Sequence, residues 1–201
     1  MSLIFHILIL ILSVVVHEVA HGWAAYFLGD STAKLAGRLT LNPLPHLDLV
    51  GSIIIPLLTY NLGGFIFGWA KPVPYNPYNL QAGHWGPAIV AVAGPVANLF
   101  LATCFALVIR LTVGVLPVAF TQLAIAIVIV NLSLALFNLI PVPPLDGSKI
   151  LFALIPYRHR HIEELLTRYK LFWAILAITV IAPLLMPIIR PLFQLSTGLS
   201  I

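Results

Sequence analysis

Long apolar stretches separated by short polar ones dominate the pattern of this chain. A helix needs about 20 mostly apolar residues to cross the hydrocarbon core of a bilayer. Four stretches meet that requirement, at residues 3–28, 86–115, 117–140 and 171–189. We therefore predict an all-α polytopic membrane protein in which each of these stretches forms a transmembrane helix.

A fifth apolar stretch, residues 49–70 ("LVGSIIIPLLTYNLGGFIFGWA"), is interrupted by Pro56, Asn61, Gly63, Gly64 and Gly68. Irregular backbone at membrane depth is tolerated only where protein or a wet cavity satisfies its polar groups. We therefore favour a re-entrant or interfacial hairpin here over a complete span. The preceding "RLTLNP", residues 38–43, alternates like a strand and stops at Pro43, so we expect a short membrane-associated β-element.

Composition supports lipid as the main solvent of this chain. Apolar residues make up 61% and charged residues 8%, whereas soluble domains carry about 25% charged residues. The net charge of +4 comes from loops and no basic water-facing domain is evident, which argues against nucleic-acid binding. Cys104 is the single cysteine, so a cysteine-based zinc cluster is excluded.

The basic residues give the chain an orientation. If the first helix ends in the cytoplasm, only Arg110 and Arg190 fall outside. The other eight fall on or near the cytoplasmic side, as the positive-inside rule requires: Lys34, Arg38, Lys71, Lys149, Arg158, Arg160, Arg168 and Lys170. This orientation also requires residues 49–70 to enter and leave on the same side.

The first span contains His17-Glu18-Val19-Ala20-His21, an H-E-x-x-H pattern. Two histidines four residues apart share one helix face and can bind one zinc ion, with the intervening glutamate beside the metal-bound water. Ionisable groups are costly inside a membrane, and a bound metal compensates for that cost. The alternative is a polar helix–helix contact in which Glu18 pairs with one of the histidines.

Asp146 is the candidate third ligand, because catalytic zinc commonly has three protein ligands. Prolines at 141, 143 and 144 forbid a regular helix before it, so the third span should unwind next to this carboxylate. The alternative is an ordinary turn in which Asp146 caps the helix predicted over residues 147–155.

Three motifs together resemble the site-2 proteases, a family of zinc intramembrane metalloproteases. They are H-E-x-x-H at 17–21, G-P-x-x-N at 94–98 and N-x-x-P-x-P-x-L-D-G at 138–147. The resemblance covers residues 5–150 and is closest to the compact prokaryotic type, since no PDZ domain separates the second and third core spans. It implies one Zn²⁺ per chain held by His17, His21 and Asp146.

The resemblance also implies roles for three further residues. Glu18 would be the general base, and Asn138 would donate to the oxyanion. Asn98 would either bind substrate or contact a neighbouring helix.

We accordingly expect residues 1–201 to form one membrane-embedded metalloprotease domain, with a three-helix catalytic core and an extra C-terminal span. The expected partners are the lipid bilayer and a single-pass transmembrane substrate, and the sequence leaves the oligomeric state open. The protein should reside in a prokaryotic cell membrane with its active site in the cytoplasmic half. The competing function is metal-ion transport, which usually needs ligands at successive depths and often shows an internal repeat.

Overall fold

The computed structural model describes residues 3–63, 68–112 and 114–200, which are mainly helical and contain no strand. The α-helices are α1 (Leu3–Phe27), α2 (Thr32–Leu35), α3 (Ile55–Gly63), α4 (Gly86–Thr112), α5 (Val118–Asn138), α6 (Gly147–Leu154), α7 (His161–Arg168), α8 (Lys170–Leu176), α9 (Ala182–Leu184) and α10 (Met186–Thr197). Turns of π-helix at Val50–Ile54 and Ala177–Ile181 precede α3 and α9. Four 3₁₀ turns lie at Leu44–His46, Pro77–Asn79, Gly83–Trp85 and Tyr157–His159.

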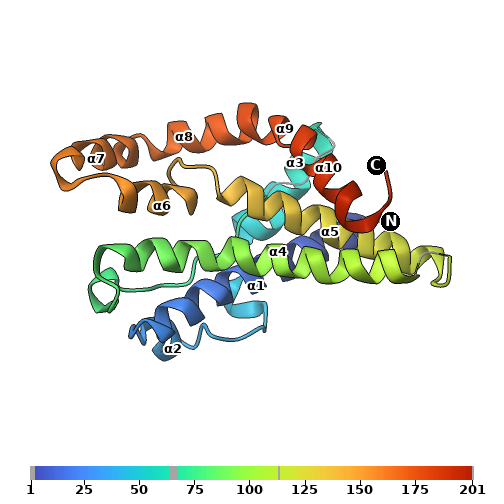
Figure 1. Cartoon of the computed structure of the whole chain (residues 1–201), viewed down its shortest axis with the longest axis horizontal. Coiled ribbons are helices and arrows are strands. Elements are labelled where there is room, and N and C mark those ends of the chain that lie inside the picture. Colours follow the sequence, from blue (N-terminus) through green and yellow to red (C-terminus); the bar gives the residue numbers. More distant parts are fainter. Residues whose placement is uncertain (1–2, 64–67, 113, 201) are drawn as a thin grey trace.

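The helices α1, α4 and α5 are long and apolar enough to cross a membrane. Helix α4 packs against both of the others and runs between opposite ends of the molecule (Figure 1). The all-helical fold with three membrane-length helices is therefore confirmed. The C-terminal end of α1, the N-terminal end of α4 and the C-terminal end of α5 lie toward one end of the bundle (Figure 1).

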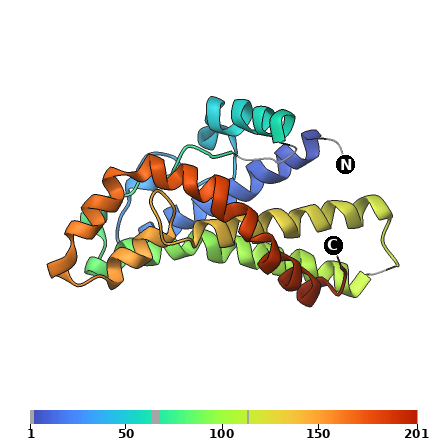
Figure 2. The same ribbon diagram turned by 90° about the horizontal axis from the view of Figure 1, so that it is seen from above.

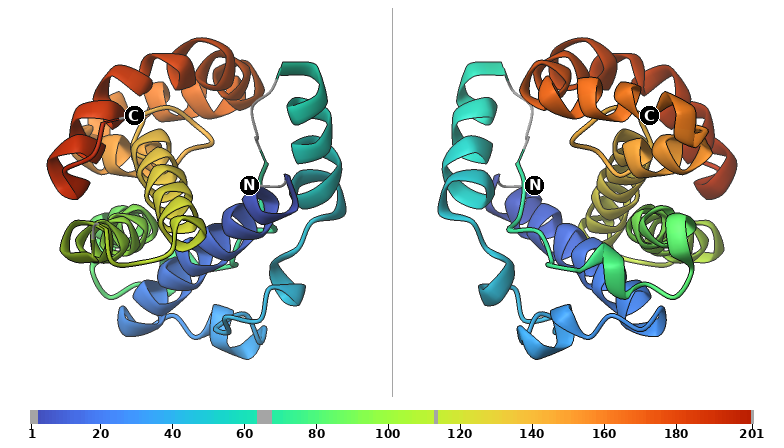
Figure 3. Two further views of the ribbon diagram at one scale, coloured as in Figure 1. Left: turned by 90° about the vertical axis from the view of Figure 1, so that its right-hand side faces the viewer. Right: turned by 90° about the vertical axis from the view of Figure 1, so that its left-hand side faces the viewer.

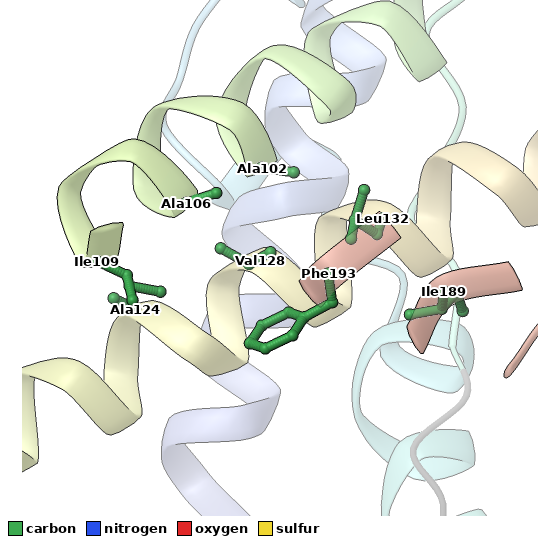
Figure 4. Close-up of a cluster of buried hydrophobic side chains, with 8 residues drawn as sticks. All are labelled: Ala102, Ala106, Ile109, Ala124, Val128, Leu132, Ile189 and Phe193. Atoms are coloured by element: carbon green, nitrogen blue, oxygen red, sulfur yellow. The ribbon is translucent and has the colours of Figure 1, made fainter. Parts of the chain in front are cut away.

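Small residues let α4, α5 and α10 pack closely. Ala106 of α4 points toward Val128 of α5, Ala124 of α5 lies beside Ile109 of α4, and the fully buried Phe193 of α10 lies next to them (Figure 4). Without a hydrophobic force between helices in lipid, such close van der Waals contact is what holds spans together. The buried cluster comprises Ala102, Ala106, Ile109, Ala124, Val128, Leu132, Ile189 and Phe193.

Large apolar side chains cover the outer faces of α1 and α4. Phe5, Leu8, Phe100 and Leu107 are all at least 48% exposed, although they lie within α1 and α4. A continuous apolar surface of this kind needs a nonaqueous environment. The outer surface of the bundle thus fits an integral membrane protein.

The predicted β-element at 38–43 is wrong: the structure has bends and irregular backbone there. The side chain of Arg38 folds inward and its Nη2 donates to the carbonyl of Lys71 at 2.6 Å. The Thr40 carbonyl accepts from Nε2 of the buried His46, 3.0 Å away. The bond from His46 occupies the Thr40 carbonyl, a backbone group that a strand partner would otherwise take.

The hairpin predicted at 49–70 is not confirmed, and residues 64–67 of it lie outside the described part of the chain. Its first part is helical through α3, on the side of α1 away from α4 (Figures 2 and 3). The Trp69 amide donates to the Gly51 carbonyl at 3.0 Å, so the chain returns to the start of this short apolar helix.

The expected fourth span at 171–189 is a series of shorter helices. Lys170–Leu184 reaches membrane length only together with α7, from which it is bent by 67°. Pro183, Pro187 and Pro191 lie in α9 and α10, and proline in this region removes backbone donors and bends a helix.

Candidate metal centre

Three metal-binding side chains converge where α1 meets the turn after α5. The Nε2 atoms of His17 and His21 lie 3.0 Å apart. Oδ2 of Asp146 is 3.0 Å from the first and 3.1 Å from the second. Both histidines are buried, while the Asp146 side chain is 22% exposed. The residues predicted at 17, 21 and 146 are therefore brought together.

Hydrogen-bond partners determine which nitrogen of each imidazole carries the proton. Nδ1 of His21 lies 2.7 Å from the Val90 carbonyl, which can only accept, so this nitrogen is the donor. Nδ1 of His17 donates to Oδ1 of Asn98 at 2.6 Å. The Asn98 amide is oriented in turn by its Nδ2, which donates to the Ser13 carbonyl at 3.2 Å. When both imidazoles are neutral, Nε2 of each therefore presents a lone pair.

Two bare nitrogens and a carboxylate oxygen thus face one another within 3.1 Å. One shared proton could satisfy one pair of these atoms, but not all three at once. Ligand atoms in tetrahedral zinc sites are about 3.3–3.4 Å apart, given bond lengths of about 2.0–2.1 Å. The three donor atoms and their spacing fit Zn²⁺. Within the described residues, His17, His21 and Asp146 form a group that could hold a metal ion.

Gly94 in α4 makes room for this cluster. A Cβ at this position would lie 2.5 Å from Nε2 of His21 and 2.6 Å from Nε2 of His17. Helix α4 can therefore approach the imidazoles because residue 94 has no side chain. One turn later in the same G-P-x-x-N motif, Asn98 reaches His17.

Asp146 occupies the N-cap position of α6, yet its side chain makes no capping hydrogen bond. Helix α5 ends at Asn138, and the proline-rich turn that follows carries Asp146 back to α1. Its carboxylate faces the histidines. The geometry therefore favours the ligand interpretation over the simple N-cap.

Glu18 is held by a segment distant in sequence. Its Oε2 accepts a hydrogen bond from the backbone amide of Val73, with an N–O distance of 2.7 Å. The chain around Val73 is tied down on its N-terminal side, where the Lys71 amide donates to the His46 carbonyl at 2.8 Å. One carboxylate oxygen of Glu18 is therefore held in place by this hydrogen bond.

Asn98 and Asn138 differ in their surroundings. Asn98 is fully buried and contacts α1 through His17 and Ser13, as expected of a helix–helix contact. Asn138 donates from Nδ2 to the Leu134 carbonyl of its own helix at 2.9 Å. A hydrogen bond therefore joins Asn98 to His17 of the His/Asp cluster, whereas the Asn138 side chain bonds to its own helix.

Asn131 and the backbone amide of Val73 are part of the site and were not predicted from the sequence. Asn131 is fully buried and accepts a hydrogen bond from Asn98 Nδ2 at 2.7 Å. A polar residue within the apolar run of α5 was the available signal, since polar groups within spans are commonly functional. The role of a backbone amide leaves no signal in the sequence.

Comparison with known proteins agrees with this site. The model of Peptidase family M50 matches residues 115–182, which contain Asp146. "Putative zinc metalloprotease YwhC" of Bacillus subtilis (strain 168) is 42% identical over 157 residues, covering 75% of this chain and 68% of that protein.

Two mycobacterial proteins named "Putative zinc metalloprotease Rip2" also match. The one from Mycolicibacterium smegmatis is 31% identical over 175 residues, or 85% of this chain and 63% of that protein. The one from Mycobacterium tuberculosis (strain H37Rv) is 27% identical over 176 residues, or 87% of this chain and 66% of that protein. No solved structure gives a significant match.

A His/His/Asp cluster with an adjacent glutamate, held among membrane-length helices, defines a membrane zinc metalloprotease. With the sequence matches added, the chain belongs to peptidase family M50, the site-2 protease family. The comparisons give no support to the metal-ion transporter alternative.

Proposed function

We propose that the protein hydrolyses peptide bonds in or near the transmembrane segments of membrane-anchored, single-pass substrates, using one zinc ion per chain. The observation that carries this proposal is the convergence of His17, His21 and Asp146. Their donor atoms converge between α1 and the turn after α5, inside a bundle with an apolar outer surface. A peptide bond reaching this site must come from the membrane or its immediate edge.

His17, His21 and Asp146 would hold the ion. When bound there, zinc would lower the pKa of water toward 7 and polarise a carbonyl. Glu18 takes the proton from the attacking water and passes it to the leaving amine. The Val73 amide, which binds one oxygen of Glu18, keeps the carboxylate from swinging away during this transfer.

The developing oxyanion needs a hydrogen-bond donor. Asn138 is the proposed donor, because its bond to Leu134 engages only one of its two amide hydrogens. Asn98 instead supports His17, since its amide is fully buried against α1. Its predicted contribution to substrate binding is thus indirect, through the metal site.

The proposed location is a prokaryotic cell membrane, with the site in its cytoplasmic half. His17 and His21 lie in the second half of α1, whose C-terminal end leads to Lys34 and Arg38. Arg110 lies at the opposite end of the bundle, in the last turn of α4. Under the positive-inside rule, the end with more lysine and arginine is cytoplasmic.

The test compares the wild type with Glu18→Gln in proteoliposomes containing a panel of single-pass membrane proteins tagged at both ends. We expect cleavage of a panel member by the wild type and loss of at least about 10²-fold in the variant, the lower range for a general base. Zinc content should stay at one per chain in both. Glu164→Gln, on the surface helix α7, is the matched control.

Cleavage that persists in Glu18→Gln would exclude the proposed mechanism. Zinc that remains after replacement of both His17 and His21 by alanine would exclude the proposed site.

A further inference from the structure

A series of hydrogen-bonded, buried polar side chains extends from His17 across three helices. Asn98 of α4 contacts His17, Asn131 of α5 contacts Asn98, and Ser13 of α1 contacts both asparagines. Ser13 is 4% exposed, and both asparagines are fully buried. The proposed chemistry assigns no task to Ser13 or Asn131.

The side-chain amides of Asn131 and Asn98 each have one possible orientation. Nδ2 of Asn131 donates to the Ile127 carbonyl at 2.9 Å, and a backbone carbonyl cannot donate in return. Its second hydrogen goes to Oγ of Ser13, also at 2.9 Å. Oδ1 of Asn131 must therefore face Asn98, where it accepts at 2.7 Å.

The same reasoning then applies to Asn98. Both hydrogens of its Nδ2 are used, one by the Ser13 carbonyl and one by Asn131. Only Oδ1 remains for His17, so Nδ1 of His17 must carry the proton and Nε2 must be bare. Reversing either amide would place like groups against each other in a buried site, which is costly.

We propose that Asn131 and Ser13 are positioning residues that hold the Asn98 amide and thereby keep His17 in its metal-binding tautomer. This inference rests on the proposed zinc site. It adds a relay, the hydrogen-bonded series Ser13–Asn131–Asn98–His17, which spans α1, α4 and α5. Outer-shell partners of ligating histidines commonly affect metal affinity by about 10–100-fold. Because Ser13 and Asn131 act in series through Asn98, their effects should not add.

The experiment measures zinc affinity of the full chain in detergent by competition with a chromophoric chelator, and records the visible spectrum of the Co²⁺-loaded form. Asn131→Leu should weaken zinc binding by about tenfold, the lower end of the range for such partners, and alter the Co²⁺ spectrum. Ser13→Ala, which keeps the backbone carbonyl, should give a smaller loss in the same direction. The double variant should match Asn131→Leu alone.

Thr103→Val is the matched control, because it removes a polar group from α4 whose hydroxyl bonds only within that helix, to the Leu99 carbonyl. It should leave the zinc affinity and the Co²⁺ spectrum unchanged. Wild-type affinity in both Asn131→Leu and Ser13→Ala would overturn the relay, as would effects that add in the double variant.

Failure of the zinc site itself gives a different result. In that case the wild type would bind no stoichiometric zinc, or His17→Ala would bind it as tightly as the wild type. Loss of zinc in Asn131→Leu together with a wild-type Ser13→Ala and a much lower unfolding temperature would indicate a packing role, and would also overturn the proposal.

Discussion

At the scale of single residues, the absence of a side chain at position 94 matters as much as the ligands that face it. Gly94 lies in contact with both imidazoles, and the added Cβ of alanine would come within 2.6 Å of their Nε2 atoms. Real Cβ atoms do not approach this closely, so α4 or the two histidines would have to move. Either shift changes the spacing of the donor atoms.

We therefore predict that Gly94→Ala weakens zinc binding more than about tenfold, as changes that disorient ligands commonly do, while the helical content is retained. Zinc competition and circular dichroism in detergent measure the two quantities. Val96→Ala, at a 53% exposed position of the same helix, is the control and should bind zinc normally. Equal zinc affinity in Gly94→Ala and the wild type would mean that α4 does not press on the ligands.

The ligands themselves could be predicted because their positions follow from local rules. His17 and His21 are one helical turn apart, and the prolines before Asp146 indicate an irregular segment next to a carboxylate. Asn131 could not be placed in this way. Which face of α5 meets Asn98 depends on how the two helices are rotated against each other, and that is a property of the packed bundle.

At the scale of elements, Asp30 ties the loop that follows α3 to the end of α1. It is fully buried and accepts hydrogen bonds from Thr32 Oγ1 at 2.6 Å, the Asn76 amide at 2.8 Å and Asn79 Nδ2 at 2.9 Å. Burial alone would raise the pKa of Asp30, but these hydrogen bonds outweigh it and hold the pKa below its usual value. The same loop carries Val73 to Glu18.

A carboxylate whose pKa is lower in the folded state stabilises the fold above its unfolded pKa of about 3.9. That contribution is lost as the pH falls through the folded value. We predict that Asp30→Asn lowers the free energy of unfolding at pH 7 by about 1–3 kcal/mol, the cost of unsatisfied buried partners. The difference from the wild type should shrink below about pH 4.

Thermal unfolding in detergent at pH 7 and pH 3 measures this, with the exposed Glu164→Gln as the control. A difference between the wild type and Asp30→Asn that stays constant over this pH range would show that the charge of Asp30 does not stabilise the loop.

The elements whose prediction was not confirmed share a physical cause. Alternation at 38–43 favours a strand only if a partner strand is available, and here the His46 side chain takes the Thr40 carbonyl instead. Hydropathy over 171–189 favours one span, but it does not register the prolines that break the segment into α8, α9 and α10. Long periodic helices such as α1, α4 and α5 leave less room for such competition.

At the scale of the whole molecule, the ends of the bundle differ in charge and in chemistry. Helix α2 follows the end of α1 that carries the histidines, whereas the α4–α5 connection lies at the opposite end (Figure 1). Leu35 in α2 is 86% exposed, and Val115 in the connection is 80% exposed. These two positions therefore report on opposite faces of the membrane.

Cys104 is the single native cysteine, so a cysteine-free background needs only Cys104→Ala. We predict that, in spheroplasts of an expressing bacterium, a membrane-impermeant maleimide labels Val115→Cys without permeabilisation. It should label Leu35→Cys only after detergent is added, because the proposed orientation puts that end, with the eight basic residues, in the cytoplasm. Labelling of Leu35→Cys in intact spheroplasts, with Val115→Cys protected, would invert the chain and place the zinc site in the outer half of the membrane.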